Sequence, residues 1–596
     1  MTEVLSSVPL PRQKSITTKW IGGPGTGKTS VLLDYLKKEI EEYDNNITDI
    51  QFLSFSKAQV EDVKNRIREL LPKKIQGILK KHIRTIHGAA LSSMIQLGYI
   101  NLNRSSEGGW TVISDDKKYS KYYYQDFSNQ HGLTYEYNLG TLFTDDNTPR
   151  FMKSIPEGNA FFAINNHLAG KMWDYDLWPT AIYKLGMRVD KRLIDTTLFT
   201  HWEKYKKSHR LLEHEDYCKM ALEIRPVLPG KVLFIDEFQD MSPSHYALFE
   251  MWRDQGTFER IYIAGDPNQS IYGFRGCDPT YLINTSGIGE GAYGENIPQS
   301  HRCPSMIIDF ADTVLGEVSN MTPSREGGII EWFGPNQALY GFEIDGVIDK
   351  ILILQQKFQR VMVLCRFQSQ IKKWHDAFNQ RGIPHLAISK KYDTWDKLHS
   401  ECKHKQSIGK ILPALHGFDR YHNGENESSI SLDDARTFIR LIPLDEKIKS
   451  GLINFLNHKN PEKPVMVSTL IGQLSMWIEG LDPHSLIDKI AIKEKHAQSI
   501  RNLLHLAVEN QYYFSPDSIL LDTLHSSKGL QSPAVLIDCS FIKDRTDDVI
   551  IDPSEERRVG YVGVTRASEH VVLIEPFNAV WNPVFETAKE RWHGFY

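Results

Sequence analysis

A glycine-rich stretch near the N-terminus constrains the fold more than any other part of this sequence. Residues 22–29 read GGPGTGKT; they follow the apolar, strand-like segment TTKWI and run directly into a segment with an apolar stripe at helical spacing. Further on, the strand-like segment DIQFLSFS precedes KAQVEDVKNRIREL, whose apolar residues again recur at helical spacing. Because strand and helix alternate here, we predict a parallel sheet covered by helices, which places the chain in the α/β class.

The strand pattern is interrupted twice along the chain. Residues 97–200 are rich in Tyr, Asn and Asp, and residues 391–514 are polar and helix-like. Around these two stretches, short apolar runs return that are typical of buried strands: KVLFI, RIYIAG, RVMVLC, SILLDT, AVLID and HVVLI. This order predicts two α/β cores, each split by an inserted region.

Composition excludes several classes of protein. A chain of 596 residues is too long for one hydrophobic core, and its net charge of −5 argues against a protein that coats nucleic acid through bulk charge. Any nucleic-acid binding would therefore be local, in a groove. No apolar run reaches the length of a membrane span, the N-terminus lacks a signal-peptide pattern, and the six cysteines show no CxxC spacing. We expect a cytoplasmic protein without a disulfide framework or a zinc finger.

The glycine-rich stretch also carries chemistry. Its spacing, Gly22-x4-Gly27-Lys28-Thr29, matches a phosphate-binding loop (P-loop), and it lies between a strand and a helix as such a loop does. Glycines allow backbone N–H groups to close around phosphate oxygens, and the helix N-terminus adds positive potential. We expect Lys28 to reach the β- and γ-phosphates of a nucleotide and Thr29 to ligate Mg²⁺. The context disfavours a plain glycine turn, but the loop alone would suit a kinase or a GTPase equally well.

A second acidic motif narrows the chemistry. The apolar run from Val232 to Ile235 ends in Asp236 and Glu237, and Gln239 continues the polar cluster. A carboxylate at a strand end beside a P-loop is where an aspartate holds Mg²⁺. The glutamate that follows is positioned to polarise an attacking water as a general base. The pair favours nucleotide hydrolysis over phosphoryl transfer to a small molecule.

A third motif, residues 261–279, reads IYIAGDPNQSIYGFRGCDP. A buried strand ends at a sharp turn, the amide of Gln269 follows, and Tyr272, Phe274 and Arg275 then crowd around two glycines. The motif predicts that one short segment senses a ligand at one end and grips another at the other end.

The ordered motifs resemble those of superfamily 1A DNA helicases, the UvrD/Rep/PcrA-like group. The resemblance rests on GGPGTGKTS, LSFSKAQVEDVKNRI, IRTIHGAAL, DEFQD, GDPNQSIYGFRG, QSHRCP, LHSSKGLQSP and YVGVTRASE, in the family's order from about residue 20 to 575. It implies two RecA-like P-loop cores with parallel sheets, 1A and 2A, each interrupted by a mainly helical insertion, 1B and 2B. The implied division is 1–96 and 201–300 for 1A, 97–200 for 1B, 301–390 and 515–596 for 2A, and 391–514 for a short 2B.

The resemblance assigns catalytic roles to individual residues. Gln269 would contact the γ-phosphate and the catalytic water, while Arg302 and Arg566 match two arginine fingers that would reach across from the second core. Such arginines stabilise charge that develops on the γ-phosphate. The expected catalytic set is Lys28, Asp236, Glu237, Gln269, Arg302 and Arg566, with Thr29 and Asp236 as the Mg²⁺ ligands.

The expected nucleotide site departs from the family pattern at several positions. Ser30 stands where the family has an arginine, His301 where it has a tyrosine, and Gln531 where it has an acidic residue; Gln13 lies closer to the P-loop than the usual adenine-reading glutamine. These departures leave the base selectivity open. The full expected nucleotide-binding set is Gly22, Gly23, Pro24, Gly25, Thr26, Gly27, Lys28, Thr29, Ser30, Gln13, His301, Gly529 and Gln531.

The same matching places a DNA path along the chain. The expected DNA-contacting residues are Phe55, Thr85, His87, Tyr272, Phe274, Arg275, Thr523 and His525. The resemblance implies an ATP- and Mg²⁺-dependent motor that moves 3′→5′ on single-stranded DNA and opens duplex at single/double-strand junctions. It also implies a monomer or weak self-association, a loading, repair or replication protein as a partner, and a bacterial or phage-infected cell.

Three alternatives remain open. The short 391–514 insertion favours considering a translocase that strips proteins from single strands but unwinds poorly. A 5′→3′ motor of superfamily 1B is disfavoured by the aromatic–arginine extension of GDPNQSIYGFRG. A nucleotide-gated DNA-binding switch without hydrolysis is disfavoured by the intact set of catalytic residues. The biological pathway, whether repair, replication or recombination, is not indicated by any motif.

Overall fold

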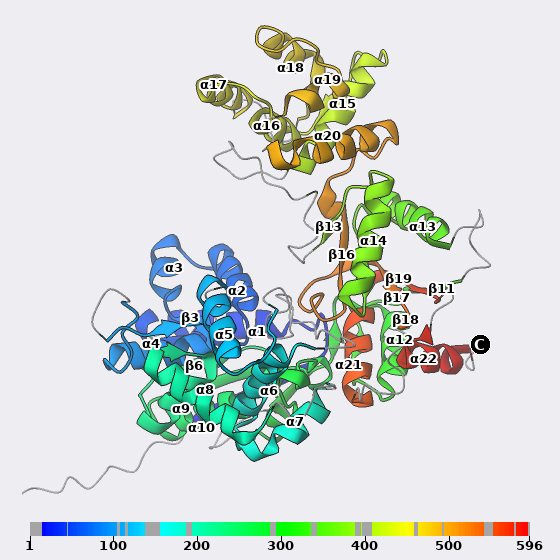
Figure 1. Ribbon diagram of the computed structural model, residues 1–596. Helices are drawn as coiled ribbons and strands as arrows, with labels where there is room; N and C mark the ends of the chain where they lie inside the picture. The colour runs from blue at the N-terminus through cyan, green and yellow to red at the C-terminus, as the bar shows by residue number, and fades with distance from the viewer. Residues whose placement is uncertain are drawn as a thin grey trace, which may run out of the picture. The chain divides into compact units, whose positions relative to one another are not determined.

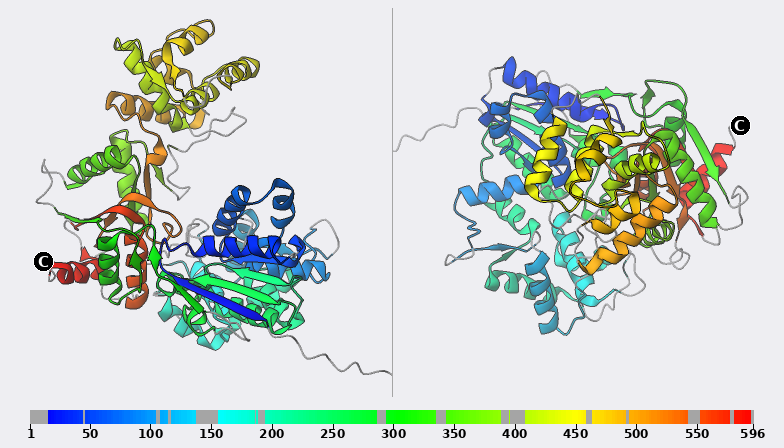
Figure 2. Two further views of the ribbon diagram at one scale, coloured as in Figure 1. Left: turned by 180° about the vertical axis from the view of Figure 1, so that it is seen from behind. Right: turned by 90° about the horizontal axis from the view of Figure 1, so that it is seen from above.

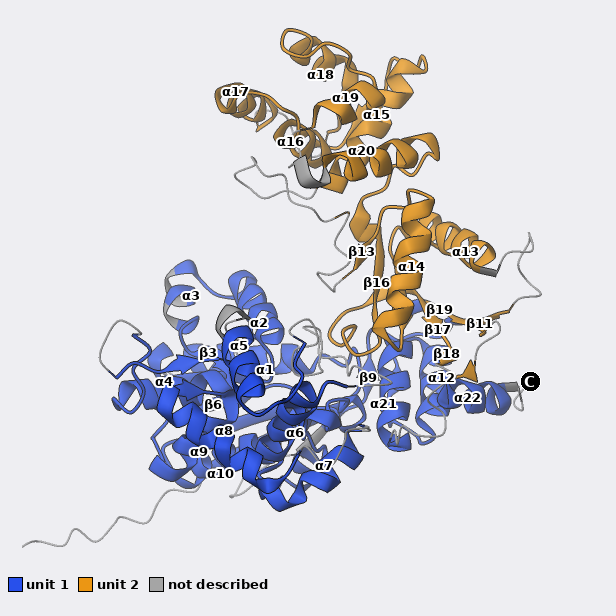
Figure 3. Cartoon of the chain, viewed as in Figure 1, with its two compact units in different colours: residues 1–329, 542–569, 582–596 blue, residues 330–541, 570–581 orange. Residues whose placement is uncertain are grey.

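The structure is a computed structural model, and the chain forms two compact units in it (Figures 1 and 3). Unit 1 comprises residues 1–329, 542–569 and 582–596, and unit 2 comprises residues 330–541 and 570–581. The residues that the structure describes are 15–43, 46–103, 108–113, 117–136, 155–185, 187, 194–285, 294–334, 343–387, 395, 408–457, 463–490, 494–541, 552–576 and 580–593.

Unit 1 is built on a six-stranded sheet in the order β3-β2-β6-β7-β1-β8, and all of its neighbouring pairs are parallel. Parallel strands place their carboxyl ends at one edge of the sheet, so the loops after β1, β6 and β7 open on the same side. The strands are β1 (Ile16–Gly22), β2 (Ile50–Ser54), β3 (Ile83–Thr85), β6 (Val232–Ile235), β7 (Arg260–Gly265) and β8 (Gly294–Ile297).

Helices cover both faces of this sheet (Figure 2), because successive strand residues point to opposite sides. Phe52 and Phe234 stack on one face, with ring centroids 5.7 Å apart, in a core shared with α1 and α2. Leu233 and Ile235 point to the other face, in a core shared with α4, α9 and α10. These helices are α1 (Lys28–Glu41), α2 (Lys57–Leu70), α4 (Ile86–Gln96), α9 (His214–Ile224) and α10 (Pro243–Asp254).

Further helices of unit 1 enclose a core of their own that is dominated by aromatic rings. Phe127 and Trp202 lie 4.9 Å apart between ring centroids, and Phe161 and Phe162 pack beside them. The smaller helices and the strand pair β4 (Thr111–Val112) and β5 (Leu211–Leu212) complete this part. The helices of this core are α5 (Lys117–Gln130), α6 (Glu157–Lys171), α7 (Trp178–Lys184) and α8 (Thr196–His209), whereas α3 (Lys73–Leu79) contributes Leu79 to the core shared with α1 and α2.

Segments from near the middle and the end of the chain meet within unit 1. A Cβ added at Gly560 would lie 2.8 Å from Val314 Cγ1 and 3.3 Å from Val584 Cγ1, so glycine permits the close approach of three helices. The elements of this part are β9 (Gln299–Ser300), α12 (Ser305–Leu315), β10 (Thr322–Pro323), α21 (Pro553–Val564) and α22 (Pro583–His593), whereas α11 (Thr280–Asn284) packs Leu282 into the core shared with α4, α9 and α10.

Unit 2 contains a second six-stranded sheet in the order β11-β19-β17-β12-β16-β13. The central pairs β17–β12, β12–β16 and β16–β13 are parallel. Helices α13 (Glu343–Phe358) and α14 (Gln368–Gln380) share a core with it. The strands are β11 (Ile329–Phe333), β12 (Val361–Cys365), β13 (Leu386–Ala387), β16 (Ile519–Thr523), β17 (Ser532–Asp538) and β19 (Ala567–Ile574); β18 (Ser540–Phe541) pairs separately with β20 (Val580–Trp581).

A group of helices in unit 2 has its own hydrophobic core, which includes Leu415, Phe418 and Phe438. Phe418 and Phe438 lie 4.8 Å apart between ring centroids. This group of helices also contains a short antiparallel strand pair, β14 (Ser429–Ile430) with β15 (Val465–Met466). The helices are α15 (Leu412–His422), α16 (Leu432–Leu441), α17 (Glu446–Asn457), α18 (Val467–Leu474), α19 (Pro483–Lys489) and α20 (Glu494–Glu509).

The predicted fold class is confirmed: both expected parallel sheets are present, and helix-rich sequence follows the first strands of each. The sequence analysis missed β3 and β8, which lie at the two edges of the first sheet and are only three and four residues long. Short edge strands bury few apolar side chains and so leave little periodic signal. Within the described residues, the structure contains no helix with the length and apolarity needed to cross a membrane. The division into four domains stays a prediction.

Candidate active site

The P-loop follows β1 and opens α1, as predicted. Gly25 and Gly27 have φ of +75° and +87°, a left-handed backbone conformation that favours glycine. Lys28 is buried, and its Nζ donates hydrogen bonds to the carbonyl oxygens of Gly22 and Gly23, at 2.7 and 3.0 Å. The ammonium group is thus held over the loop, where the phosphates of a nucleotide are expected to lie.

The two expected Mg²⁺ ligands lie together. The hydroxyl of Thr29 donates to Oδ2 of Asp236 at 2.7 Å, which joins the first turn of α1 to the end of β6. Burial, together with the neighbouring Glu237, raises the pKa of Asp236 to about 6. A hydroxyl beside a buried carboxylate is the oxygen donor set that Mg²⁺ prefers, so these residues fit the ion.

A chain of polar side chains connects the ends of β6 and β7. Gln239 is fully buried; its amide donates to the Glu237 carboxylate, and its Oε1 accepts from the backbone N–H of Asp266 at 3.0 Å. Oδ2 of Asp266 in turn accepts from Nε2 of Gln269 at 2.7 Å. Burial raises the pKa of Asp266. Glu237, the predicted base, and Gln269, the predicted sensor, are therefore linked through two buried side chains.

Sequence reasoning left Gln239 and Asp266 out of the predicted site. Asp266 follows β7 directly and Gln239 lies four residues after the end of β6, and those two strands are neighbours in the sheet. The adjacency of β6 and β7 follows from the order of the strands in the sheet, which differs from their order in the sequence. The motif positions alone therefore carried only a weak signal.

Both predicted arginine fingers lie in unit 1 with the P-loop. Nη2 of Arg566 lies 3.5 Å from Oε1 of Gln269, and Nη1 of Arg302 donates to the carbonyl oxygen of Thr565 at 3.2 Å. Arg566 is only 1% exposed, and burial, reinforced by the charge of Arg302, lowers its pKa to about 9. A buried guanidinium beside a phosphate-binding loop is suited to an anionic ligand.

The segment with Arg302 packs directly on the P-loop. Oγ of Ser300 donates to the carbonyl oxygen of Pro24 at 2.7 Å, and the N–H of His301 donates to the carbonyl oxygen of Gly25 at 3.0 Å. A Cβ at Gly25 would lie 2.4 Å from the Cβ of Arg302, so only glycine permits this approach. The P-loop and the segment with the first predicted arginine finger are therefore in direct contact.

The aromatic residues gather into one cluster, which we call the aromatic platform: Phe55, Tyr272 and Phe274. The rings of Phe55 and Tyr272 stack, with centroids 5.4 Å apart and planes inclined by 19°, and Phe274 meets Tyr272 edge-on at 6.1 Å. The Arg275 guanidinium lies 6.0 Å from the Phe274 ring. Nδ1 of His167, on α6, lies 2.9 Å from the carbonyl oxygen of Phe274.

Helix α21 makes two hydrogen bonds to the backbone of the loop that joins Gln269 to the platform. Oε1 of Glu555 accepts from the N–H of Gly273 at 3.1 Å, and Nε of Arg558 donates to the carbonyl oxygen of Ser270 at 2.8 Å. A Cβ at Gly273 would lie 2.5 Å from Oε2 of Glu555. The helix that precedes Arg566 therefore also contacts the backbone of residues 270–273.

The remaining predicted residues are more dispersed. Thr85 caps α4 by accepting from the N–H of Gly88 at 3.0 Å, and the ring of His87 lies 4.3 Å from that of His245. Ser30 is exposed at the surface of unit 1. Gln13 lies outside the described residues. The predicted residues of unit 2, whose roles stay predictions, are Thr523, His525, Gly529 and Gln531.

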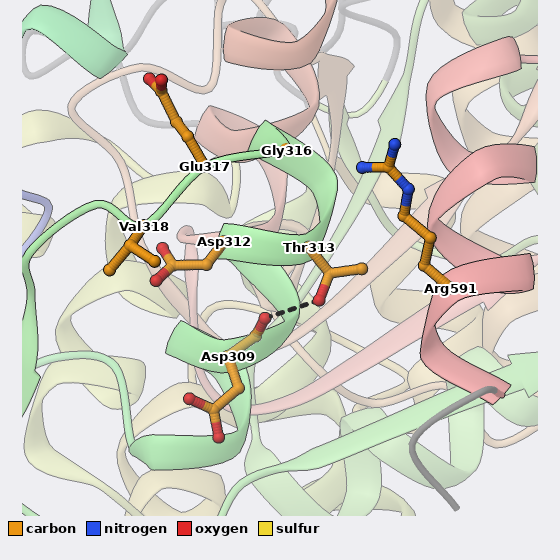
Figure 4. Close-up of a pocket in the computed structure, with 7 residues that line it drawn as sticks. All are labelled: Asp309, Asp312, Thr313, Gly316, Glu317, Val318 and Arg591. Atoms are coloured by element: carbon orange, nitrogen blue, oxygen red, sulfur yellow. Dashed lines mark hydrogen bonds between the residues drawn. The ribbon is translucent and has the colours of Figure 1, made fainter.

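A pocket of about 460 Å³ lies elsewhere in unit 1, between α12 and α22 (Figure 4). Its side chains include Asp309, Asp312 and Arg591, and none of its lining residues belongs to the predicted site. It is therefore not the candidate active site.

Two family models match the chain, and together they cover more than half of it. The model described as the UvrD/REP helicase N-terminal domain matches residues 13–287, and the one described as the UvrD-like helicase C-terminal domain matches residues 518–574. The Bacillus subtilis (strain 168) protein YjcD is 22% identical, over 94% of this chain and 76% of its own length. A protein of Staphylococcus epidermidis, described as ATP-dependent DNA helicase PcrA, is 20% identical over 92% of this chain and 80% of its own length. These matches show that the chain belongs to the UvrD/REP helicase family and is an ATP-dependent DNA helicase of that type.

Proposed function

We propose that this protein is an ATP-dependent DNA motor that moves 3′→5′ along single-stranded DNA and opens duplex ahead of it. One observation carries the proposal. The segment 265–275 runs from Gln269, beside Arg566 and the acidic residues, to Phe274 on the aromatic platform. A short covalent path therefore joins the predicted hydrolysis site to the predicted DNA grip.

The chain's own residues account for the chemistry of hydrolysis. Lys28 and the P-loop N–H groups bind the β- and γ-phosphates of ATP, and Thr29 and Asp236 would hold Mg²⁺. When bound, Mg²⁺ neutralises phosphate charge. Glu237 orients the attacking water and takes its proton, and Gln269 positions that water against the γ-phosphate. The guanidinium groups of Arg302 and Arg566 stabilise the charge that develops as water bonds to the γ-phosphorus and its bond to the β–γ bridging oxygen breaks, releasing ADP. The proposed catalytic set is Lys28, Asp236, Glu237, Gln269, Arg302 and Arg566, with Thr29 and Asp236 as the Mg²⁺ ligands.

The buried polar side chains that link Glu237 to Gln269 support a coupling between nucleotide hydrolysis and DNA binding. A shift at Gln269 would be passed along the adjoining backbone of residues 270–273, which α21 contacts through Glu555 and Arg558. The same backbone carries Tyr272 and Phe274. Base stacking on aromatic rings contributes about 1–3 kcal/mol per base without reading sequence. The platform is therefore suited to a motor that must step along any strand.

Three properties of the proposal draw their support from family membership: the nucleotide is ATP, the strand is DNA, and the polarity is 3′→5′. The PcrA relatives are described as ATP-dependent DNA helicases. A switch without hydrolysis is the less favoured reading. The Glu237 carboxylate accepts from the amide of Gln239, and the Glu237 backbone N–H donates to Oδ1 of Asp236 at 3.0 Å, which supports a general base beside the expected Mg²⁺ ligand.

The proposal is tested by steady-state ATP hydrolysis with and without single-stranded DNA, combined with unwinding of duplexes tailed at only the 3′ or only the 5′ end. We expect strong stimulation by DNA and strand separation from 3′ tails alone. Separation from 5′ tails alone would reverse the polarity. Stimulation without separation would favour a translocase that unwinds poorly, and absence of stimulation would overturn the coupling through residues 265–275.

A further inference from the structure

Three side chains from separate helices converge beside the aromatic platform. His87 lies in the first turn of α4, Glu215 in the first turn of α9 and His245 in the first turn of α10. Each offers one ligand atom, and these atoms all lie within 4.8 Å of one another. Neither Glu215 nor His245 belongs to the site described above, and nothing in the hydrolysis chemistry uses them.

The spacing of the ligand atoms is that of a metal site. Nε2 of His245 lies 3.2 Å from Nε2 of His87, which lies 3.4 Å from Oε1 of Glu215. A zinc ion bonded at about 2.0–2.1 Å to each ligand in a tetrahedron sets ligand atoms about 3.3 Å apart. Both measured separations match that edge length.

Hydrogen bonding alone accounts poorly for the same contacts. Nε2 of His245 is equally far, 3.2 Å, from both ring nitrogens of His87, and the two rings are inclined by 80°. A single hydrogen bond prefers an in-line approach to one nitrogen. Among the residues that the structure describes, no hydrogen-bond partner reaches Nδ1 of His245 or Oε2 of Glu215, although both atoms are buried.

We infer that His87, Glu215 and His245 form a binding site for a divalent metal ion of the Zn²⁺ type, with a fourth position open to water. Two imidazoles and one carboxylate are a donor set that zinc uses when it keeps one position open. One of these imidazoles, that of His245, is only 2% exposed.

The charge around the site both opposes and supports the ion. The N-termini of α4, α9 and α10 carry partial positive charge, which disfavours a cation. The carboxylate of Glu215 offsets that charge. His214 lies next to the site, with its ring centroid 5.0 Å from that of His87, but its Nδ1 lies 2.5 Å from the hydroxyl of Tyr217. His214 is therefore outside the proposed ligand set.

A metal ion at this site would restrict the aromatic platform through the contact between His245 and Phe55. The ring of His245 contacts Phe55 edge-on, with centroids 6.0 Å apart, and Phe55 stacks on Tyr272. Joining three helices at this point restricts the motion of Phe55. His87 would then be a metal ligand, whereas the resemblance to the helicase family implies that it contacts DNA.

The test is a Zn²⁺ titration of the purified full chain, after removal of metal, in competition with a chromophoric chelator. The titration contains excess Mg²⁺, which occupies the oxygen ligands near the P-loop and so keeps Zn²⁺ from binding there. Mg²⁺ does not compete for imidazole, so the proposed site stays available to Zn²⁺. The chain contains 22 histidines, so variants must identify the site. The informative variants are His245→Gln and Glu215→Gln, and His214→Gln is the matched control.

We expect one tightly bound Zn²⁺ per chain in the wild type and in His214→Gln. We expect His245→Gln and Glu215→Gln to weaken binding by more than about 100-fold, beyond the 10–100-fold typical of losing an outer partner of a ligand. Circular dichroism establishes that each variant is folded. In wild type substituted with Co²⁺, we expect visible absorption bands of a tetrahedral site, which both ligand variants lose.

Equal Zn²⁺ affinity in all four proteins would overturn the inference. So would loss of binding in His214→Gln with retention in His245→Gln. Neither result depends on ATP hydrolysis or unwinding, so this inference and the proposed function fail separately.

Discussion

At the level of single side chains, Glu237 occupies an unusual position. Its φ is +56°, a left-handed conformation that non-glycine residues adopt at a cost, and its carboxylate accepts from Gln239. The conformation turns the side chain away from the line of β6 and toward the polar chain. Strained backbone of this kind clusters at functional sites, and it supports the role of general base.

We predict that Glu237→Gln lowers DNA-stimulated ATP turnover by about 10²–10⁴-fold, the usual contribution of a general base, because glutamine cannot take the proton. Affinity for ATP should change little, since the amide keeps the hydrogen bond to Gln239. Phosphate release and equilibrium nucleotide binding measure the two effects. The control is Glu41→Gln, at an exposed position of α1. Turnover within a few-fold of wild type would contradict the assignment.

His167 predicts a pH effect on stability. Burial lowers its pKa from 6.5 to about 4, and Nδ1 is held by the carbonyl oxygen of Phe274. The unfolded chain therefore binds a proton near pH 6.5 that the folded chain accepts only near pH 4. Stability is present above pH 6.5 and is lost as pH falls toward 4, by up to about 1.4 kcal/mol per pH unit.

We expect His167→Gln to make this acid dependence less steep by up to one proton. Urea unfolding, followed by tryptophan fluorescence at pH 6.5, 5.5 and 4.5, measures the slope. His201→Gln, at an exposed position of α8, controls for the loss of one imidazole. Because other buried histidines remain, some acid dependence should persist. An unchanged slope in His167→Gln would show that this residue does not contribute.

At the level of elements, α21 (Pro553–Val564) connects the two ends of the predicted mechanism. Its first turn holds the backbone N–H of Gly273, and Arg566 follows its C-terminus beside Gln269. A helix is a rigid connector, so motion at one end is carried to the other. The sequence gives no hint of this contact, since Gly273 and Glu555 lie 282 positions apart.

We predict that Glu555→Ala reduces the stimulation of ATP turnover by single-stranded DNA while ATP binding and turnover without DNA are retained. Removing the acceptor leaves the N–H of Gly273 without its partner, a loss of about 1–3 kcal/mol that loosens the loop. Glu555→Gln keeps an acceptor oxygen and should restore stimulation. Phe274→Ala should resemble Glu555→Ala if the loop and the platform act together. Equal loss of basal and stimulated turnover in Glu555→Ala would contradict a coupling role.

At the level of the whole molecule, the chain combines parts with separate hydrophobic cores. The helices α15–α20 enclose their own core, distinct from that of the second sheet. A part with its own core is able to change without dismantling its neighbours. This independence is what an accessory role in unwinding requires.

We predict that replacing residues 408–509 with a short Gly/Ser linker changes duplex unwinding much more than DNA-stimulated ATP turnover. The predicted catalytic residues all lie in unit 1, outside the replaced segment. Tailed-duplex unwinding and phosphate release, measured on the same preparation, separate the two activities. Parallel loss of both in a variant that keeps its circular dichroism spectrum would show that these helices support hydrolysis itself.

The sequence alone determined the α/β class, the strands β1, β2, β6 and β7, and the family. Strong local signals carried these results: apolar runs, helical periodicity and the backbone freedom of Gly25 and Gly27. Motifs of this kind depend on residues that are close in sequence. They are therefore legible without knowledge of the fold.

Tertiary structure alone decided which distant residues meet. The link from Glu237 through Gln239 and Asp266 depends on β6 and β7 being neighbours, and the His87–Glu215–His245 cluster depends on three helix ends meeting. No local pattern encodes either arrangement, because strand order and helix packing are set by the burial of apolar surface over the whole unit. The physical division is that local backbone preferences are written in short stretches of sequence, whereas contacts between them arise only when the core forms.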